Sequence, residues 1–230
     1  MNIDVTNENI GQDISILSTK TYKETLTKKT PYKIVKRGMD FIFALIGLIV
    51  LSPIFAIIAV AIKLESKGPV FFKHTRIGKN GKIIKIYKFR SMVENAEELI
   101  KKFTPEQMKE YKENYKLTND PRITKVGKFL RKTSLDELPQ LINIIKGELS
   151  IIGPRPVVQE ELKKYGSNAE KFLSVTPGLT GYWAANGRSC TSYEQRMEME
   201  LFYVDNFSFK MDAKVFFKTI GAVIKREGAI

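Results

Sequence analysis

The residues best suited to chemistry are two adjacent carboxylates, Asp136 and Glu137, in the segment Thr133-Ser134-Leu135-Asp136-Glu137-Leu138-Pro139-Gln140. The chain has a single cysteine, Cys190, which excludes an internal disulfide and any multi-cysteine metal site. Its single histidine, His74, argues against a Ser-His-Asp triad and against a two-histidine metal site. Any chemistry must therefore use carboxylates and cations, with or without a hard metal.

Two interpretations of the carboxylate pair are open on spacing alone. Ser134 and Glu137 match a capping box, in which Glu137 would only bond back to the backbone of Ser134. Pro139 would then occupy the fifth helical position, where its ring and missing N–H are unfavourable. A helix that begins nearer Asp136 tolerates Pro139 in its first turn and places both carboxylates at a positive helix N-terminus. The dipeptide by itself does not choose between capping and catalysis.

The charge of the chain predicts an anionic partner. Lys and Arg number 38 against 25 Asp and Glu, a formal net charge of +13 in 230 residues. Such an excess is typical of proteins that bind nucleic acid, phospholipid headgroups or a phosphorylated substrate. The length permits one domain with a substantial core, or a membrane element followed by one compact domain.

An apolar segment, residues 39–62, has Asp40 as its only charge. A helix of this length would be about 36 Å long, enough to span a bilayer. Ser52-Pro53 in its middle predicts a bend, and the Ser52 hydroxyl can bond a carbonyl that the proline frees. Cations flank both ends, whereas spanning helices show a lysine and arginine asymmetry. We therefore predict a helix-break-helix segment that enters one leaflet and returns, with a kinked spanning helix as the alternative.

A basic β-hairpin is predicted next, with strands over 70–76 and 82–89 and a turn at Asn80-Gly81. Every charge on the second strand is positive, and most of these lysines are expected to face solvent or headgroups. Lys88 and Arg90, beside aromatic residues at the end of this strand, are candidate phosphate ligands.

The rest of the chain is predicted to be mostly helical. Helices are expected over 93–117, divided at Thr104-Pro105, over two parts of 126–145, over 193–203 and over 211–225. Prolines hold Arg155 in the extended segment Gly153-Pro154-Arg155-Pro156. In the loop 177–188, N–H groups freed by glycine, together with Arg188, suit a diphosphate or nucleotide. We expect the last helix to lie at a membrane interface, although packing on the core is the alternative.

Several motifs follow one another in a specific order: Lys36-Arg37, Ser52-Pro53, Gly68-Pro69-Val70-Phe71, Lys88-Phe89-Arg90-Ser91-Met92, residues 130–140, Gly153-Pro154-Arg155-Pro156, Pro177-Gly178-Leu179-Thr180-Gly181 and Asn186-Gly187-Arg188. In this order they resemble the bacterial sugar transferase family, the monotopic polyprenyl-phosphate phosphoglycosyl transferases. The resemblance covers about four-fifths of the chain. Ala184-Ala185 departs from it, because many relatives carry a glutamine there.

The resemblance implies transfer of a sugar 1-phosphate from a UDP-sugar to undecaprenyl phosphate, with release of UMP. It implies that Asp136 is the nucleophile, that Glu137 helps to hold Mg²⁺, and that a re-entrant helix broken at Ser52-Pro53 holds the protein in the inner leaflet. The implied ligands of the diphosphate and the lipid phosphate are Lys88, Arg90, Arg131 and Arg155, with Arg188 added from the glycine-rich loop. The same loop favours galactose or glucose over an N-acetylated amino sugar.

The predicted architecture is α+β and mostly helical, with a small β-hairpin and interfacial amphipathic helices. Residues 1–30 form a polar arm, residues 31–66 the re-entrant membrane helix, and residues 67–230 a cytoplasmic catalytic domain at the inner membrane. The predicted partners are UDP-sugar, undecaprenyl phosphate and membrane lipids, without nucleic acid. One alternative is a membrane-tethered module that binds nucleic acid or other anions. Its binding would weaken with salt, but the sequence carries no recognised nucleic-acid-binding motif. The other alternative is a non-catalytic scaffold. Both would be indifferent to Asp136→Asn.

Overall fold

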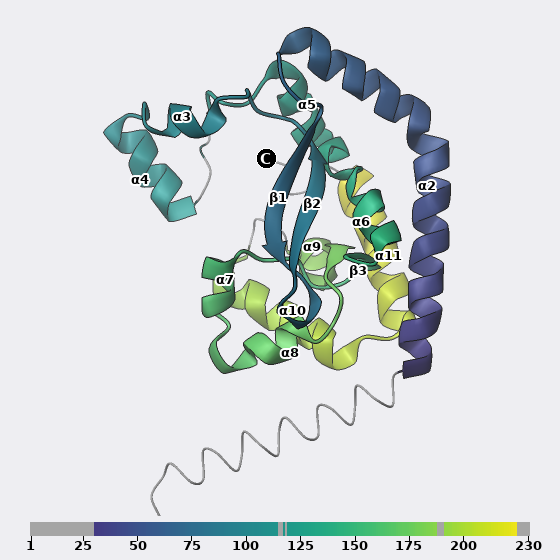
Figure 1. The fold of residues 1–230 in the computed structure, drawn as a ribbon. Coiled ribbons are helices and arrows are strands. Elements are labelled where there is room, and N and C mark those ends of the chain that lie inside the picture. Colours follow the sequence, from purple (N-terminus) through teal and green to yellow (C-terminus); the bar gives the residue numbers. More distant parts are fainter. Residues whose placement is uncertain (1–29, 115–116, 118, 188–190, 225–230) are drawn as a thin grey trace, which may run out of the picture. The chain divides into compact units, whose positions relative to one another are not determined.

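The computed structural model describes residues 30–114, 117, 119–187 and 191–224 (Figure 1). Contacts divide the chain into residues 1–39 and residues 40–230, and the features below belong to the second unit unless stated. The predicted polar arm, apart from Thr30, lies outside the described residues, as does Arg188.

The described elements follow in chain order. They are α2 (Thr30–Glu65), β1 (Phe71–Ile77), η1 (Lys79–Gly81), β2 (Ile83–Phe89), α3 (Ala96–Ile100), α4 (Pro105–Asn114), α5 (Lys125–Thr133), η2 (Leu135–Glu137), α6 (Gln140–Lys146), β3 (Ser150–Ile152), α7 (Gln159–Lys163), η3 (Gly166–Asn168), α8 (Ala169–Leu173), β4 (Gly178–Thr180), α9 (Tyr182–Asn186), α10 (Tyr193–Asn206) and α11 (Phe209–Ile224), where η marks a 3-10 helix. The described chain is thus mostly helical α+β, as predicted.

Two small sheets complete the fold. Strands β1 and β2 pair antiparallel from Phe71↔Phe89 to Ile77↔Ile83, which confirms the predicted hairpin. Asn80 and Gly81 both adopt positive φ in its turn, the conformation that an Asn-Gly pair favours. The second sheet pairs β3 and β4 in parallel, a short contact that the sequence did not predict.

The apolar segment α2 supplies one wall of the core. One cluster joins α2 to β2, α6 and the start of β3, through Ala44, Leu48, Leu51, Ile84, Ile86, Leu141, Ile144 and Leu149. A second joins its C-terminal half to β2 and α5, through Phe55, Ile58, Ile62, Phe89 and Leu130. Each fully buried side chain of this size contributes about 1.5–3 kcal/mol.

Helix α2 continues through Pro53 without interruption. Proline has no N–H, so the carbonyl four residues earlier, that of Ile49, loses its helical donor. The Ser52 hydroxyl donates to this carbonyl at 2.8 Å, as the sequence predicted. Figure 1 shows that α2 changes direction along its length. The expected break is therefore a bend within one helix, because Ser52 replaces the missing hydrogen bond.

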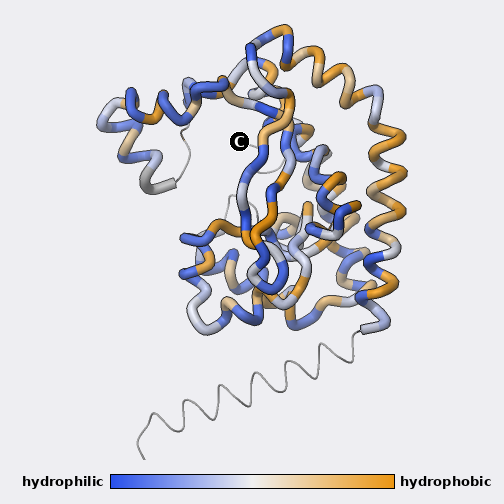
Figure 2. The backbone as a smooth tube through the Cα atoms, viewed as in Figure 1, coloured by the Kyte–Doolittle hydropathy of each residue, from blue (hydrophilic) through white to orange (hydrophobic). Residues whose placement is uncertain are grey.

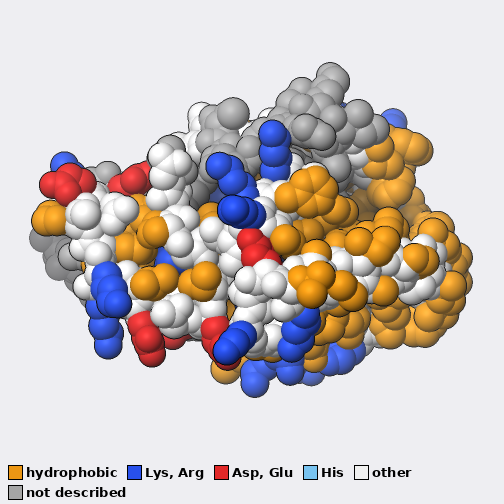
Figure 3. All heavy atoms as spheres, turned by 90° about the horizontal axis from the view of Figure 1, so that it is seen from above, with side chains coloured by type: hydrophobic (Ala, Val, Ile, Leu, Met, Phe, Trp, Pro, Cys, Tyr) orange, Lys and Arg blue, Asp and Glu red, His pale blue; other side chains and the backbone are white. Residues whose placement is uncertain are grey.

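Much of α2 remains apolar and exposed. Its exposed side chains include Ile42, Phe43, Ile46, Ile49, Val50, Ile57, Val60 and Leu64. Figure 2 shows that hydrophobic residues dominate α2, and Figure 3 shows hydrophobic atoms gathered on the side where α2 lies. By length and composition, α2 is the one described helix able to cross a membrane. An exposed apolar surface of this kind indicates membrane association.

Polar side chains fasten both ends of the Asp40–Glu65 part of α2 to the same unit. The buried Asp40 carboxylate accepts from the N–H of Ile151 in β3 at 3.0 Å. At the other end, Glu65 accepts from the N–H groups of Lys125 and Val126 at 2.6 and 2.9 Å. Glu65 thus accepts from two of the four N–H groups that lack helical partners at the N-terminus of α5, in addition to the N-cap residue Thr124.

Replacing Glu65 should weaken this attachment. We expect Glu65→Ala to lower the free energy of unfolding by about 1–2 kcal/mol, because two backbone N–H groups lose a charged acceptor. Denaturant unfolding in detergent micelles measures the change. Glu97→Ala, which removes an exposed carboxylate in the first turn of α3, is the matched control. Equal stability of the two variants would show that the Glu65 bonds do not hold α2.

Candidate active site

A sharp change of backbone direction presents Asp136 and Glu137. Helix α5 ends at Ser134, whose φ of 56° is left-handed, and the 3-10 turn η2 follows directly. Ser134 forms no side-chain cap hydrogen bond, and α6 begins only at Gln140. The capping-box interpretation is therefore wrong, because the Ser134 side chain caps neither η2, which it directly precedes, nor α6.

Leucines on either side of the carboxylates anchor this turn. Leu135 and Leu138 pack against the cluster that contains Phe89 and Leu130. Asp136 is only 9% exposed, whereas the side chain of Glu137 is 32% exposed. The two carboxylates thus occupy different environments although they are adjacent in sequence.

Lys88 faces the pair from the end of β2. Its Nζ lies 2.7 Å from Oε1 of Glu137. Burial raises the pKa of the Asp136 carboxyl to about 6, and the Glu137 charge adds to this, while Lys88 and Arg131 oppose it. At neutral pH Asp136 is thus mostly ionised but poorly solvated, a state suited to nucleophilic attack.

Arg131 reaches the site through a close contact between α5 and the chain after β2. Its Nε donates to Oγ of Ser91 at 2.9 Å. One turn earlier, a Cβ on Gly127 would collide with the Ser91 carbonyl. Glycine is required there so that α5 can bring Arg131 close to the carboxylates.

Arg90 has a different position from the one predicted. It is buried, and its Nη2 donates to the carbonyl and the hydroxyl of Ser66 at 2.8 and 3.0 Å. Its Nη1 donates to the Lys67 carbonyl. These bonds place the guanidinium at the C-terminus of α2, where a cation is favourable. They give Arg90 a role in attaching β2 to α2.

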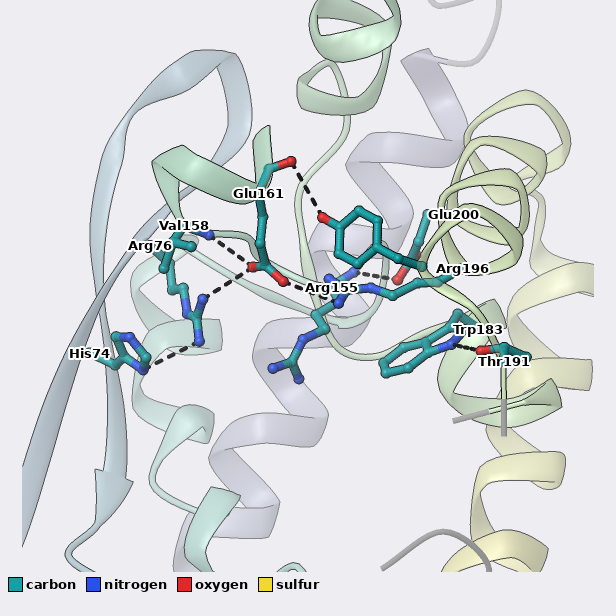
Figure 4. A network of polar contacts seen from close by, with 10 residues as sticks. His74, Arg76, Arg155, Val158, Glu161, Trp183, Thr191, Arg196 and Glu200 are labelled. Atoms are coloured by element: carbon teal, nitrogen blue, oxygen red, sulfur yellow. Dashed lines mark hydrogen bonds and ion pairs between the residues drawn. The ribbon is translucent and has the colours of Figure 1, made fainter. Parts of the chain in front are cut away.

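Arg155 belongs to a second polar cluster, shown in Figure 4. The backbone N–H of Arg155 donates to the buried Glu200 carboxylate at 3.1 Å. Its guanidinium points away from the carboxylates of Glu161 and Glu200, and its Cζ lies 5.9 Å from the Trp183 ring. The Nε of Arg155 is buried without a hydrogen-bond partner among the described residues. Arg155 is thus a cation with unused donor capacity.

Two further arginines, Arg76 and Arg196, were not predicted. Both pair with Glu161, at 3.4 and 3.2 Å. Burial would raise the pKa of Glu161, but Arg196, the Val158 N–H, Arg155 and Arg76 together lower it. The cluster could not have been found from the sequence, because its members come from β1, α7, α10 and the segment before α7.

The electrostatic fields of the two clusters overlap. The pKa of His74 falls to about 4, through burial and then through the charges of Arg76, Lys88 and Arg155. His74 lies on β1, where its pKa is lowered both by Lys88 of the carboxylate site and by Arg76 and Arg155 of the second cluster. A phosphorylated ligand near the carboxylates would be in the field of both cation groups.

Two glycines in the loop 177–188 use their N–H groups within the fold. The N–H of Gly178 donates to the Pro154 carbonyl at 2.8 Å, and that of Gly187 to the Trp183 carbonyl at 3.0 Å. A Cβ on Gly178 would collide with the Gly153 backbone. These two N–H groups hold β4 and α9 in place and are therefore not available to a phosphate.

The carboxylate pair is compatible with Mg²⁺. Within the described ranges no group of three or more His, Cys, Asp or Glu side chains could hold a metal ion. Mg²⁺ commonly uses only one or two protein carboxylates and takes its other ligands from water and substrate phosphates. Asp136 and Glu137 can supply that number, with Glu137 the more accessible of the two.

Glu200 should make stability depend on pH. Burial raises its pKa to about 7, against the Arg155 N–H and the Arg196 charge. Because this value exceeds that of the unfolded chain, the stability from protonated Glu200 is lost as pH rises toward and through 7. Relative to the unmodified chain, Glu200→Gln should therefore gain a few kcal/mol between about pH 5 and about pH 8. Thermal unfolding across this range tests it, and a pH-independent difference would contradict the assignment.

Known proteins resemble this chain over nearly all of its described length. The model of the bacterial sugar transferase family matches residues 31–226. The exopolysaccharide production protein ExoY of Sinorhizobium fredii is 46% identical over 199 residues, covering 85% of this chain and 88% of that protein.

Longer relatives match through part of their length. The undecaprenyl-phosphate galactose phosphotransferase of Salmonella typhimurium is 40% identical over 87% of this chain and 43% of its own. The UDP-glucose:undecaprenyl-phosphate glucose-1-phosphate transferase of Escherichia coli is 39% identical over 82% of this chain and 40% of its own. This chain thus spans less than half of those two proteins but most of ExoY. On the family match and the ExoY similarity, it belongs to the bacterial sugar transferase family.

Proposed function

We propose that this chain transfers a sugar 1-phosphate from a UDP-sugar to undecaprenyl phosphate and releases UMP, as a step in polysaccharide biosynthesis. The observation that carries the proposal is the buried Asp136 carboxylate beside the Lys88–Glu137 pair and Arg131. The name of the Escherichia relative specifies glucose 1-phosphate transfer from UDP-glucose to undecaprenyl phosphate, and that of the Salmonella relative specifies a galactose phosphotransferase that uses undecaprenyl phosphate. A hexose donor is therefore proposed ahead of an N-acetylated amino sugar.

Asp136 is the proposed nucleophile. One carboxylate oxygen attacks the phosphorus that bears the sugar, and the bond from this phosphorus to the bridging oxygen breaks, so that UMP leaves with the electron pair. The resulting acyl phosphate is then attacked by a phosphate oxygen of the lipid, which regenerates the carboxylate. Two displacements let a soluble donor and a lipid acceptor use one site in turn.

Cations make an anionic nucleophile compatible with an anionic substrate. Lys88 and Arg131 act at the carboxylates, and we propose that they offset charge on the transferring phosphoryl group. Glu137, with Asp136 beside it, would hold Mg²⁺, which supplies further neutralisation of phosphate charge when bound.

The second cluster suits the nucleotide part of the donor. The guanidinium of Arg155 lies next to Trp183 and points away from the Glu161 and Glu200 carboxylates, an arrangement able to bind phosphate and to contact a ring. Arg188 stays a predicted substrate ligand from the same loop. Arg90 is proposed only as a positioning residue, since its guanidinium already bonds Ser66 and Lys67.

A monotopic arrangement at the cytoplasmic face of the inner membrane is also proposed. Asp40 and Glu65, near opposite ends of the apolar segment, both bond to elements of one compact unit. A helix that crossed the bilayer would have to carry one of these ends to the other side, whereas a re-entrant helix returns both to the same face. This arrangement assigns residues 31–66 to the membrane and 67–230 to a cytoplasmic catalytic domain.

Release of UMP tests the reaction. Detergent-extracted protein with undecaprenyl phosphate, Mg²⁺ and a panel of UDP-sugars should release UMP from a hexose donor. Asp136→Asn should reduce the rate at least about a thousandfold, as removal of a nucleophile does. Chelation of the metal should also stop release.

Lys85→Met is the matched control, because Lys85 is an exposed lysine on the same strand as Lys88. It should retain activity, whereas Lys88→Met should lose most of it. Folded, lipid-bound protein that releases no UMP from any donor would refute the transferase proposal. Full activity of Asp136→Asn would refute the assignment of the nucleophile.

Thiol accessibility tests the membrane topology. In a Cys190→Ser background, cysteines placed by Lys33→Cys and Lys67→Cys should react with an impermeant maleimide from the cytoplasmic side alone. The re-entrant arrangement requires this because both positions flank the apolar segment on one face. Labelling of the two cysteines from opposite sides of sealed vesicles would instead establish a spanning helix.

A further inference from the structure

Asn143, on α6, is a fully buried polar residue outside the site described above. It is 0% exposed. Its Oδ1 accepts from the Tyr87 N–H at 2.9 Å, while its Nδ2 donates to the Lys85 carbonyl at 2.8 Å and to Oε2 of Glu148 at 2.6 Å. All polar positions of this amide are thus occupied, and two of the bonds reach the backbone of β2.

These bonds fix β2 directly before Lys88. Tyr87 is the neighbour of Lys88, and Asn143 follows Glu137 within the η2–α6 segment. The amide therefore joins the strand that carries the ammonium group to the segment that carries both carboxylates. The Tyr87 N–H requires an acceptor at position 143, whereas the Lys85 carbonyl and the Glu148 carboxylate require donors. Neither a carboxylate nor an apolar side chain of similar size can therefore replace the Asn143 amide.

Apolar packing alone does not supply this alignment. Ile84 and Ile86 on β2 pack in the same cluster as Ile144 on α6. Such contacts are non-directional, whereas hydrogen bonds require specific distances and angles. Asn143 can thus set the position of β2 along α6 within a contact that hydrophobic burial already stabilises.

We propose that Asn143 is a positioning residue for sugar-phosphate transfer, which holds β2 so that Lys88 meets Glu137 beside Asp136. The inference rests on the proposed function. The side chain of Asn143 bonds to β2 and to Glu148, so that its effect on the reaction passes through the Lys88–Glu137 contact of 2.7 Å. Displacing Lys88 by about 1 Å would lengthen this contact beyond hydrogen-bond distance.

A double-mutant cycle tests the proposal. We expect Asn143→Asp to lower kcat for UMP release by about ten- to a hundredfold, the range for displacement of a catalytic group by about 1 Å. In a Lys88→Met background, the same substitution should cost less than about twofold more, because coupled residues are non-additive. A merely structural loss would multiply in full. Glu148→Gln should restore part of the rate of Asn143→Asp, because the new amide can donate to the new carboxylate.

Two further measurements cover loss of folding. Tyr203→Phe removes a buried hydroxyl that bonds Ile152 and Asp212, and should lower thermal stability without lowering kcat. If Asn143→Asp does not fold, Glu148→Ala replaces it in the cycle. This change removes one bond at a half-buried position and should lower kcat a few-fold, but not in the Lys88→Met background.

The outcomes separate this inference from the function on which it rests. Full activity of Asn143→Asp, or a loss that multiplies with that of Lys88→Met, would overturn the positioning role while the unmodified chain still releases UMP. Failure of the unmodified chain to release UMP from any donor would instead overturn the proposed function. If Asn143→Asp does not fold, an unchanged rate of Glu148→Ala would likewise overturn the positioning role.

Discussion

Two like charges share one 3-10 turn at Asp136 and Glu137, and one of them is almost fully withdrawn from water. Withdrawal raises the free energy of the charged form, so neighbouring elements must offset it. Lys88 does so from β2 and Arg131 from α5. The contact of Gly127 with Ser91, the clamp of Asn143 on β2 and the anchors Leu135 and Leu138 all serve this arrangement.

The membrane-associated helix is part of the same construction. Its apolar face packs against β2, α5 and α6, the elements that carry the candidate site. Asp40 and Glu65 add directional bonds at the two ends of the packed stretch. Because of this attachment, a shift in the position of α2 would displace β2 and α5, which it contacts directly. A reaction that uses a lipid substrate benefits from a site built on the element that contacts the lipid.

The second cluster holds more cations than anions in a partly buried position, and its two carboxylates differ in environment. Three arginines surround Glu161, while Glu200 lies buried against Arg155 and Arg196. Glu161 is held ionised by the arginines, and Glu200 is pushed toward its neutral form by burial. The net surplus is positive, which favours an anion beside Arg155. Close approach of Gly153 and Gly178 gives Arg155 its fixed backbone.

Local interactions made several features predictable from the sequence alone. Asn80-Gly81 determined the hairpin, and Ser52-Pro53 predicted both the bend of α2 and the carbonyl that Ser52 bonds. The ordered motifs from Lys36-Arg37 to Asn186-Gly187-Arg188 identified the family, which the match over residues 31–226 confirms. The positions of Arg90 and Asn143, the bonded N–H groups of the glycine-rich loop and the left-handed Ser134 depended on tertiary structure. Each is set by partners far along the chain or by competition between adjacent helices, and sequence spacing does not encode which distant carbonyl or carboxylate lies within 3 Å.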